Sequence, residues 1–454
     1  MKIKSINPFN GKTNQEFDPI SYEASELAVS SAKEAFLKWR KAPIAERLKP
    51  IAELASIFRR GTRDYASIIT REMGKPTRQA ISEIEKCALV CDYYCSNAER
   101  FLQNEIISSQ FAKSYVTFEP LGVILGIMPW NFPFWQAVRW AIPTLAAGNA
   151  CLLKHASNVP LSALEIEKTF REAGFPENIF RTLLIGSLTA ERLIEGDRID
   201  GVSLTGSVQA GSKVASVAGR HLKKLVLELG GSDPFLVLED ADVDRAVSTG
   251  VSARFSNAGQ SCIAAKRFIV AEPVAGAFAE KFAAALDRLK IGDPMSEQTD
   301  IGPVAREEFL RDLSAQLHDA EEKGAVVHHG PKPPDQGFFF RPAVLTNVKP
   351  DMKVMREEVF GPIAPIITAR SEEEMVRIAN ETEFGLGGTI WSRDTRKAER
   401  LATEIPAGFV AINGRVKSDP RFPFGGVKKS GYGRELSHYS LKEFVNIKTV
   451  IVGQ

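Results

Sequence analysis

The sequence has few cysteines, no long apolar run and no excess of charge of either sign. Its 454 residues include five cysteines, too few for a disulfide scaffold, and the odd number suits a reducing compartment. No stretch approaches the ~20 apolar residues of a membrane-spanning helix, and the first residues lack the apolar core of a signal peptide. The formal net charge is only +2, so there is no electrostatic footprint for nucleic acid or an anionic membrane. These absences predict a cytoplasmic protein that binds neither nucleic acid nor a membrane.

Three of the cysteines repeat at helical spacing. Cys87, Cys91 and Cys95 are four residues apart, which places them on one face of a helix. A metal site would need further ligands, and no histidine lies in that segment. The pattern favours an inert, core-facing stripe over a metal site. Cys151 lies in an apolar run and is expected in the core, so no metal is predicted.

The remaining cysteine, Cys262, lies in a segment of small and polar residues, 257–262, soon after the segment 227–231. A thiol with an ordinary pKa of ~8.5 is ionised to only a few per cent at neutral pH, so a cysteine nucleophile needs a base or a positive field. Glu228 ends an apolar, strand-like run and could abstract or relay the proton. The spacing suggests a catalytic pair. The alternative is a buried cysteine beside a glutamate that caps a loop.

Five motifs then occur in one order along the chain: PWNFP at 129–133, LELGG at 227–231, GQSC at 259–262, EEVFGP at 357–362 and PFGGVK at 423–428. In this order they resemble the signatures of the aldehyde dehydrogenase superfamily, and the resemblance covers nearly the whole chain. The segments MPWNFPFWQ at 128–136 and LKHA at 153–156 are similar to the short bacterial NAD(P)-dependent succinate-semialdehyde dehydrogenases.

Strand-like runs alternate with helical stretches from residue 123 to residue 229, which predicts a parallel sheet with helices on both faces. The first hundred residues are predicted to be helical, and a second α/β unit starts near Pro234. The resemblance implies an α/β protein with a Rossmann-like cofactor domain (1–108 and 124–228), an α/β catalytic domain (229–425) and a β oligomerisation arm (109–123 and 436–454). It therefore implies a homodimer or homotetramer in which the C-terminal strand pairs with the arm.

The resemblance also places a cofactor. A strand-to-helix turn at 205–211 can present backbone N–H groups to a phosphate, although an ordinary turn is the alternative. Family members use a G-S-x-x-x-G turn here, matched by Gly206, Ser207 and Gly211. They also place a lysine, here Lys154, against the adenosine ribose. Three positions later NAD enzymes often carry glutamate, where this chain has Ser157.

A neutral Ser157 beside Lys154 favours NADP, with NAD possible. The alternative is that Ser157 only caps the following loop and that both cofactors are accepted. Glu358 and Phe360 match the family residues that hold the nicotinamide ribose and ring, and Trp130 is assigned to the same site.

For the chemistry, the resemblance assigns Cys262 as the nucleophile that attacks the aldehyde carbon to give a thiohemiacetal. The Asn131 amide and the Cys262 backbone N–H would hold the oxyanion, each worth ~3 kcal/mol of barrier. After hydride transfer, Glu228 would activate water to hydrolyse the thioester. Without the resemblance, Asn131 is only a turn residue.

The substrate is predicted to be a small anionic aldehyde, best matched by succinate semialdehyde oxidised to succinate. An anion needs a cation or several donors, and Gln136 and Arg139 share the helix face of Asn131. Arg139 is the predicted carboxylate anchor, with a salt bridge as its alternative. The remaining predicted substrate contacts are Trp135, Phe424 and Ser418. Some succinate-semialdehyde dehydrogenases carry arginine at the position of Ser256, so their mode of carboxylate binding is in doubt here.

Other functions stay open from the sequence. The enzyme could act on another small aldehyde, such as glutarate semialdehyde or an aliphatic aldehyde. A CoA-dependent, acylating version is disfavoured because Glu228 is present to activate water. A non-catalytic binding member of the family is the alternative from a different class, against which Cys262, Glu228 and Asn131 together argue.

Overall fold

The structure, a computed structural model, describes residues 2–453 and begins with a small antiparallel hairpin, β1 (Ile3–Ile6) and β2 (Thr13–Phe17). The prediction of helices alone was wrong here, because β2 is almost entirely exposed and carries no alternating apolar pattern. Four helices follow, as the periodicity predicts: α1 (Tyr22–Trp39), α2 (Ile44–Arg60), α3 (Thr62–Met73) and α4 (Thr77–Phe101). Along α4, Cys87 and Cys91 are buried and Cys95 is half-buried, which confirms the core-facing stripe.

The first large sheet has six strands in the order β17-β9-β8-β5-β6-β7. Five are parallel: β5 (Val123–Met128), β6 (Ala150–His155), β7 (Phe180–Thr182), β8 (Gly201–Thr205) and β9 (Lys224–Glu228). Their connections are α5 (Pro133–Ala146), α6 (Pro160–Glu172), α7 (Ser187–Glu195) and α8 (Val208–Arg220). The strand order reverses at β5, which pairs with β6 on one side and β8 on the other. A ligand crevice is therefore expected beyond the carboxyl end of β5.

The second large sheet has seven strands in the order β12-β13-β14-β11-β10-β15-β16. They are β12 (Val326–His329), β13 (Ala343–Thr346), β14 (Ile363–Ala369), β11 (Ala265–Ala271), β10 (Asp233–Val237), β15 (Gly387–Trp391) and β16 (Phe409–Ile412), and only β12 runs antiparallel. The predicted α/β fold with parallel sheets is confirmed.

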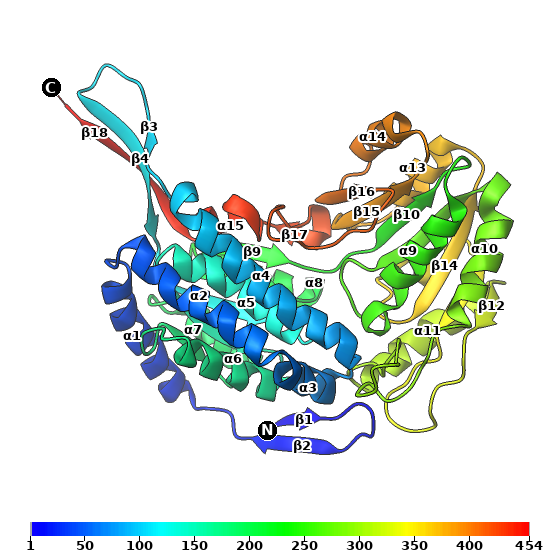
Figure 1. Ribbon diagram of the computed structural model, residues 1–454, viewed down its shortest axis with the longest axis horizontal. Coiled ribbons are helices and arrows are strands. Elements are labelled where there is room, and N and C mark those ends of the chain that lie inside the picture. The colour runs from blue at the N-terminus through cyan, green and yellow to red at the C-terminus, as the bar shows by residue number, and fades with distance from the viewer. Residues whose placement is uncertain (1, 454) are drawn as a thin grey trace.

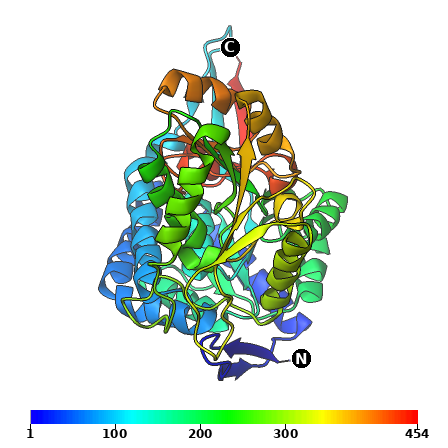
Figure 2. The ribbon, with the colours of Figure 1, turned by 90° about the vertical axis from the view of Figure 1, so that its right-hand side faces the viewer.

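Both faces of the second sheet are covered by helices. Phe235 and Val237 of β10 pack into one apolar cluster with α9 (Val243–Phe255) and α10 (Glu272–Leu286). Leu236, between them, packs into the opposite cluster, because alternate side chains of a strand point to opposite faces. That cluster includes α11 (Glu308–Glu322), α13 (Glu372–Asn380) and α14 (Thr395–Thr403). Figure 2 shows the sheet between these two groups of helices.

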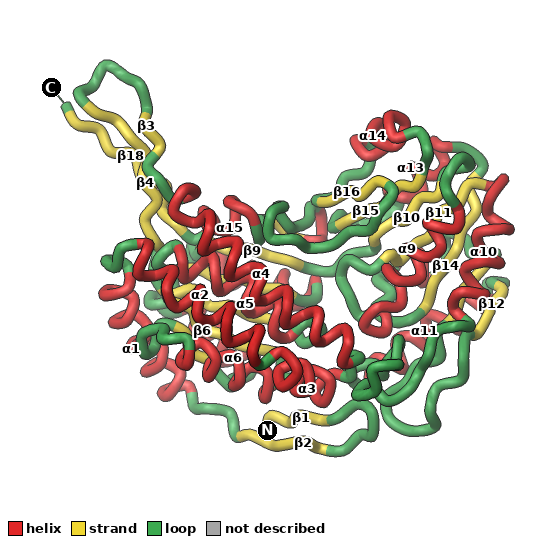
Figure 3. The backbone as a smooth tube through the Cα atoms, in the orientation of Figure 1, coloured by secondary structure: helices red, strands yellow, loops and turns green. Residues whose placement is uncertain are grey.

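Two lobes lie side by side, each with helices around its sheet (Figures 1 and 3). The chain passes from the first lobe to the second where β9 ends and β10 begins, and it returns when β17 (Gly431–Tyr432) pairs antiparallel with β9. The segment after residue 425 therefore rejoins the first sheet. The two crossings bring residues 228–233 and 424–435 between the lobes.

A three-stranded sheet projects from the first lobe (Figure 1). It consists of β3 (Glu105–Ile106), β4 (Lys113–Pro120) and β18 (Val445–Val452), with β18 antiparallel to β4 along its whole length. The predicted pairing of the C-terminal strand is confirmed. Of the segment 436–454 assigned to the arm, residues 437–443 form the helix α15 (Ser437–Glu443), which packs against the body. Within residues 2–453, no helix is long and apolar enough to cross a membrane.

Candidate active site

A left-handed turn between α9 and β11 presents Cys262. Asn257, Ala258 and Gly259 have φ angles of 54°, 53° and 75°, a region that costs residues with a side chain roughly 1–2 kcal/mol. The turn is held from both ends, since Asn257 Nδ2 donates to the Asn131 carbonyl at 3.0 Å and Gln260 Nε2 donates to the Asn257 carbonyl at 3.0 Å. The backbone strain is therefore offset by hydrogen bonds that fix the turn immediately before Cys262.

Arg254 fastens the same turn to the second lobe. This side chain is fully buried at the end of α9, and its guanidinium donates to the carbonyls of Ala265, Gly259, Val359 and Gly361. Four carbonyl acceptors stabilise a buried cation that would otherwise be costly, while its Nε has no hydrogen-bond partner among residues 2–453. The turn before Cys262 and the segment that carries Glu358 are thus held by one side chain.

Two cavities meet at Cys262. One, of about 450 Å³, extends towards α4, α5 and the loop before Phe424. The other, of about 510 Å³, extends past Trp130 towards the turn between β8 and α8. Of the residues that the structure describes, only Cys262 and Gln136 line both cavities. A ligand in either cavity can therefore reach the thiol, and the junction lies beyond the carboxyl end of β5, as the strand order predicts.

Cys262 is half-buried. Burial raises the pKa of Cys262 to about 11, and the cations Lys266 and Arg139 oppose this rise. Lys266 also fixes the backbone, because its buried Nζ donates to the Cys262 carbonyl at 2.7 Å and to Glu358 Oε1 at 2.7 Å. The cysteine is held in position in its neutral form.

Asn131 follows the carboxyl end of β5 and lines the second cavity. Its Nδ2 donates one hydrogen to the Gln260 carbonyl at 3.1 Å. An amide nitrogen has two hydrogens, so one remains for an oxygen in the cavity. This geometry places the predicted oxyanion donor in the cavity that also contains Cys262.

Glu228 is buried at the end of β9 and lines neither cavity, while its neighbours Leu229 and Gly230 line the second one. Both of its carboxylate oxygens lack a hydrogen-bond partner among residues 2–453. Burial raises the pKa of Glu228 well above its ordinary value, the nearby Glu435 raises it further, and Arg139 opposes both. Glu228 thus forms a charge cluster with Glu435 and Arg139.

The predicted cofactor residues divide into two groups. Trp130, Gly206, Ser207, Glu358 and Phe360 line the second cavity. Ser207 caps the N-terminus of α8 by accepting from the Ala210 N–H at 3.2 Å, and Trp130 packs edge-on against Phe360 with ring centroids 5.7 Å apart. Glu358 Oε1 also accepts from the Gly231 N–H at 3.1 Å.

The other three predicted cofactor residues lie outside the lining of that cavity. Gly211 permits the close packing of α8 on the segment after β9, since a Cβ there would meet the Leu229 side chain. Lys154 is at the end of β6, where burial lowers its pKa, and Ser157 is exposed in the turn that follows. Both residues lie at the carboxyl end of β6, the strand that pairs with β5.

All five predicted substrate residues line the first cavity, namely Trp135, Gln136, Arg139, Ser418 and Phe424. Arg139, however, has a partner that the prediction did not give it. Its guanidinium is buried in an ion pair with Glu435 and lies 4.7 Å from the centroid of the Phe424 ring. The salt bridge considered as its alternative role is therefore present, and a substrate contact by Arg139 stays a prediction.

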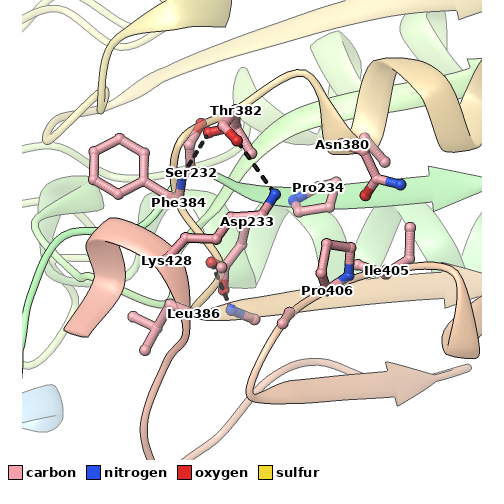
Figure 4. A pocket seen from close by; sticks show the side chains of 14 residues that line it. Ser232, Asp233, Pro234, Asn380, Thr382, Phe384, Leu386, Ile405, Pro406 and Lys428 are labelled. Carbon is pink, nitrogen blue, oxygen red and sulfur yellow. Dashed lines mark hydrogen bonds between the residues drawn. The ribbon is translucent and has the colours of Figure 1, made fainter. Parts of the chain in front are cut away.

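A third cavity beside Asp233, of about 10 Å³, is shown in Figure 4. Asp233 accepts from the Gly387 N–H at 3.0 Å, and Lys428 Nζ donates to the Thr382 carbonyl at 3.4 Å. The cavity shares no lining residue with the two that contain Cys262. It has room for about one water molecule. No three His, Cys, Asp or Glu side chains in the part of the chain described gather to hold a metal ion.

Comparison with known proteins adds the family. The model of the aldehyde dehydrogenase family matches residues 1–450. The chain belongs to the aldehyde dehydrogenase family. It is 48% identical over 451 residues to a probable NADP-dependent succinate-semialdehyde dehydrogenase from Synechocystis sp., covering 99% of each chain. It is 45% identical to the NADP-dependent succinate-semialdehyde dehydrogenase from Mycolicibacterium paratuberculosis, covering 100% of this chain and 97% of that one.

The solved structures agree. The crystal structure of succinic semialdehyde dehydrogenase from Streptococcus pyogenes with NADP+ matches with a TM-score of 0.97 and 35% identity, covering 100% of both chains. The chain described in structural work on cofactor and substrate selection by Gox0499 matches with a TM-score of 0.98 and 38% identity, again over 100% of both. The family resemblance and the fold that it implied are confirmed.

Three residues at the candidate site of this aldehyde dehydrogenase escaped the sequence analysis. Glu435 pairs with Arg139 from far along the chain, and the only signal was an acidic residue shortly after the PFGGVK motif. Lys266 lies four residues after Cys262 in a strand otherwise rich in apolar residues, a charge that needs a buried partner. Lys86 lies in α4 and lines the first cavity, and nothing in the helical periodicity of that segment marked it.

Proposed function

We propose that this protein oxidises succinate semialdehyde to succinate with NADP+, NAD+ being the weaker cofactor. The observation that carries the proposal is the meeting of two cavities at Cys262, one with a strand-to-helix turn and the other with cationic and hydroxyl groups. The named activity of the relatives at 45–48% identity over essentially the whole chain supports the substrate and the cofactor.

In the proposed reaction the neutral Cys262 thiol first loses its proton to solvent, and the resulting thiolate attacks the aldehyde carbon. The bond between sulfur and carbon forms, and the carbonyl oxygen becomes an alkoxide next to the free hydrogen of Asn131 Nδ2 and the Cys262 N–H. Donors aimed at developing charge in a site with little water are each worth ~3 kcal/mol. Because Gln260 fixes the Asn131 amide and Lys266 fixes the Cys262 carbonyl, both donors are positioned before the substrate binds.

The residues of the second cavity suit a dinucleotide. The backbone N–H groups at the start of α8 are suited to a phosphate, Glu358 to the hydroxyls of a ribose, and Phe360 and Trp130 provide apolar walls. Lys154, near the end of β6, and Ser157, just after it, offer a cation and a hydroxyl for a ribose 2′-phosphate, with no carboxylate at position 157 to repel it. When bound, the dinucleotide supplies the acceptor for the hydride that leaves the thiohemiacetal carbon.

We propose that Glu228 removes a proton from the water that hydrolyses the resulting thioester and releases succinate. A carboxylate does this only when it is deprotonated, and burial disfavours its charged form here. The approach of the Arg139 guanidinium, which lowers the pKa of Glu228, therefore assists the base. The hydrolysis step should accelerate as pH rises, because a greater fraction of Glu228 is then ionised.

The test is NADPH formation from succinate semialdehyde by the wild type and by Cys262→Ala, with Cys95→Ala as the control for loss of a half-buried thiol outside both cavities. We expect turnover in the wild type and the control, at least about 10-fold faster in kcat/KM with NADP+ than with NAD+, and none in Cys262→Ala. Turnover of glutarate semialdehyde or an aliphatic aldehyde in preference to succinate semialdehyde would overturn the substrate.

We also infer that the chain works as a homo-oligomer in the cytoplasm, divided into the cofactor unit 1–108 and 124–228, the catalytic unit 229–425 and the arm. The exposed apolar side chains on the projecting sheet support assembly through the arm: Ile106, Ile107, Phe111, Ile447, Ile451 and Val452. A reducing compartment fits a reaction that needs the free thiol of Cys262.

A further inference from the structure

The cavity on the aldehyde side of Cys262 is lined by four cationic side chains, which differ in what already neutralises or solvates them. Arg139 is paired with Glu435. Arg415 and Lys417 are exposed, and Arg415 Nη1 donates to Ser252 Oγ at 2.8 Å. Lys86 is half-buried, and its one hydrogen-bond partner within residues 2–453 is a hydroxyl. It is thus the partly desolvated cation of this cavity that lacks a carboxylate.

Lys86 is held in the cavity by neutral groups. From α4 its Nζ lies 4.1 Å from the centroid of the Trp135 ring, and it donates a hydrogen bond to the buried Ser418 Oγ. The Trp135 indole N–H is buried without a hydrogen-bond partner among the residues that the structure describes. An ammonium has three N–H donors, so two remain beside the unpaired indole donor and the hydroxyl. This group of donors matches a carboxylate, which only accepts hydrogen bonds.

Two of the three acids that line the cavity are already engaged in ion pairs, and the third, Glu85, is exposed to solvent. Glu83, one turn before Lys86, is buried in an ion pair with Lys75 and accepts from the backbone N–H groups of Phe134 and Trp135 at 2.9 and 3.0 Å. Asp419 is paired with Arg421 at 2.7 Å. Burial, and then the cations Arg139 and Lys417, lower the pKa of Lys86 to about 7. The ammonium therefore lacks the anion that would stabilise it.

We propose that Lys86 is the residue that binds the carboxylate of the aldehyde substrate, with the Ser418 hydroxyl and the Trp135 indole N–H as neutral donors. In this assignment Arg139 is a positioning residue, which orients Phe424 and Glu435 rather than the substrate. The assignment rests on the proposed oxidation of succinate semialdehyde and identifies what selects it: an uncharged aldehyde of the same length gains nothing from Lys86.

The assignment has a consequence for pH. The carboxylate binds the protonated amine, and in the free enzyme that proton is lost as pH rises through about 7. KM for succinate semialdehyde should therefore rise with pH above neutrality, whereas KM for butanal should not follow it. The charged or titratable groups that surround Lys86 are Glu83, Glu85 and Cys87 of α4, Arg139 of α5, and Arg415, Lys417 and Asp419 of the loop before Phe424.

The experiment compares wild type, Lys86→Met and Lys86→Arg on succinate semialdehyde and on butanal between about pH 6 and about pH 9. Lys49→Met is the control, because Lys49 lies exposed on α2 in an ion pair with Glu46. We expect Lys86→Met to lower the preference for succinate semialdehyde, measured as the ratio of the two kcat/KM values, by roughly 10- to 100-fold. Lys86→Arg, whose charge persists at every pH tested, should keep the preference and remove the rise of KM with pH.

Each failure has its own signature. If Lys86→Met reduced kcat/KM for both aldehydes equally, or if KM of the wild type followed the same pH curve on both, Lys86 would not be the carboxylate site. If the wild type oxidised butanal but not succinate semialdehyde, the proposed substrate would be wrong whatever the variants did. An Arg139→Gln variant that lost the preference while Lys86→Met kept it would return the carboxylate site to Arg139.

Discussion

At the scale of single residues, the surroundings of Cys262 position the thiol more than they ionise it. The left-handed turn, Lys266 and Arg254 fix the backbone on both sides of Cys262, while burial outweighs the two cations near the sulfur. An enzyme built in this way keeps its nucleophile unreactive towards passing electrophiles, because the thiolate is the reactive form. Reaction then depends on ligands that occupy the cavities.

The first prediction concerns the pH dependence of that thiol. Because the pKa of Cys262 is raised to about 11, the thiolate fraction in the free enzyme increases about tenfold per pH unit throughout the neutral and mildly alkaline range. The rate of inactivation by iodoacetamide should rise with the same slope and show no plateau near pH 8.5, the value for an ordinary thiol. A plateau at or below that pH would show that an activating group is present in the free enzyme.

The second prediction concerns Lys266. Lys266→Met removes the cation that joins the Cys262 carbonyl to Glu358, leaving Glu358 with the Gly231 N–H alone. Loss of these two contacts should shift Cys262 and Glu358 slightly, and the misplacement should lower kcat roughly 10- to 100-fold. KM for NADP+ should rise, and KM for the aldehyde should change less. Lys281→Met, which breaks a surface pair with Asp244, is the control. A variant with normal kcat would leave Lys266 a purely structural role.

At the scale of elements, the turn before Cys262 depends on one glycine. A Cβ at Gly259 would overlap the Gly361 carbonyl and the Arg254 guanidinium, and its φ of +75° is unfavourable for alanine. Gly174 has a similar φ of +85° with nothing within 4 Å, so Gly174→Ala carries the backbone cost without the clash.

The third prediction therefore compares Gly259→Ala with Gly174→Ala. Both should lose roughly 1 kcal/mol to the left-handed backbone, but Gly259→Ala should lower Tm by several degrees more and reduce kcat, because the clash moves the turn that carries Cys262. Thermal unfolding and NADPH formation measure the two effects. Equal Tm values and equal kcat values for the two variants would mean that the turn accommodates the Cβ of residue 259 without loss of stability or activity.

Sequence reasoning was most successful where the signal is local. The strands β5, β6 and β8 have apolar runs followed by helical periodicity, β9 has an apolar run that ends at the LELGG motif, and the motif around Cys262 is continuous in sequence, so these features were predicted. The hairpin β1–β2 was missed because its side chains are mostly exposed. The pairing of Arg139 with Glu435 and the position of Lys86 against Ser418 depend on segments that meet only after both lobes fold. Periodicity within one segment carries no information about contacts between segments that are far apart in the sequence.

At the scale of the whole molecule, the projecting sheet leaves six large apolar side chains exposed on β3, β18 and the loop between β3 and β4. An isolated sheet edge with apolar side chains is a site for association. The Lys448–Glu119 pair crosses the same sheet and is consistent with an orderly, folded arm.

The fourth prediction is that the double substitution Ile447→Lys with Ile451→Lys prevents assembly. Two like charges on the exposed face of β18 should turn the proposed homo-oligomer into a monomer without unfolding either lobe, because neither side chain belongs to the apolar cores. Size-exclusion chromatography with light scattering measures the mass, and circular dichroism verifies the fold. A substitution of Thr449 by serine on the same strand should leave the mass unchanged. If the double variant kept the wild-type mass, the arm would not be the interface.

The meeting of two cavities at Cys262 also bears on the order in which substrates bind and products leave. In the proposed assignment the aldehyde and the dinucleotide approach Cys262 from different sides, and among residues 2–453 only Cys262 and Gln136 line both cavities, so neither ligand would have to depart for the other to arrive. The acid formed can leave by the way its aldehyde came while the reduced dinucleotide still occupies the opposite side. The two products can therefore leave one after the other, and product release rather than chemistry can limit kcat.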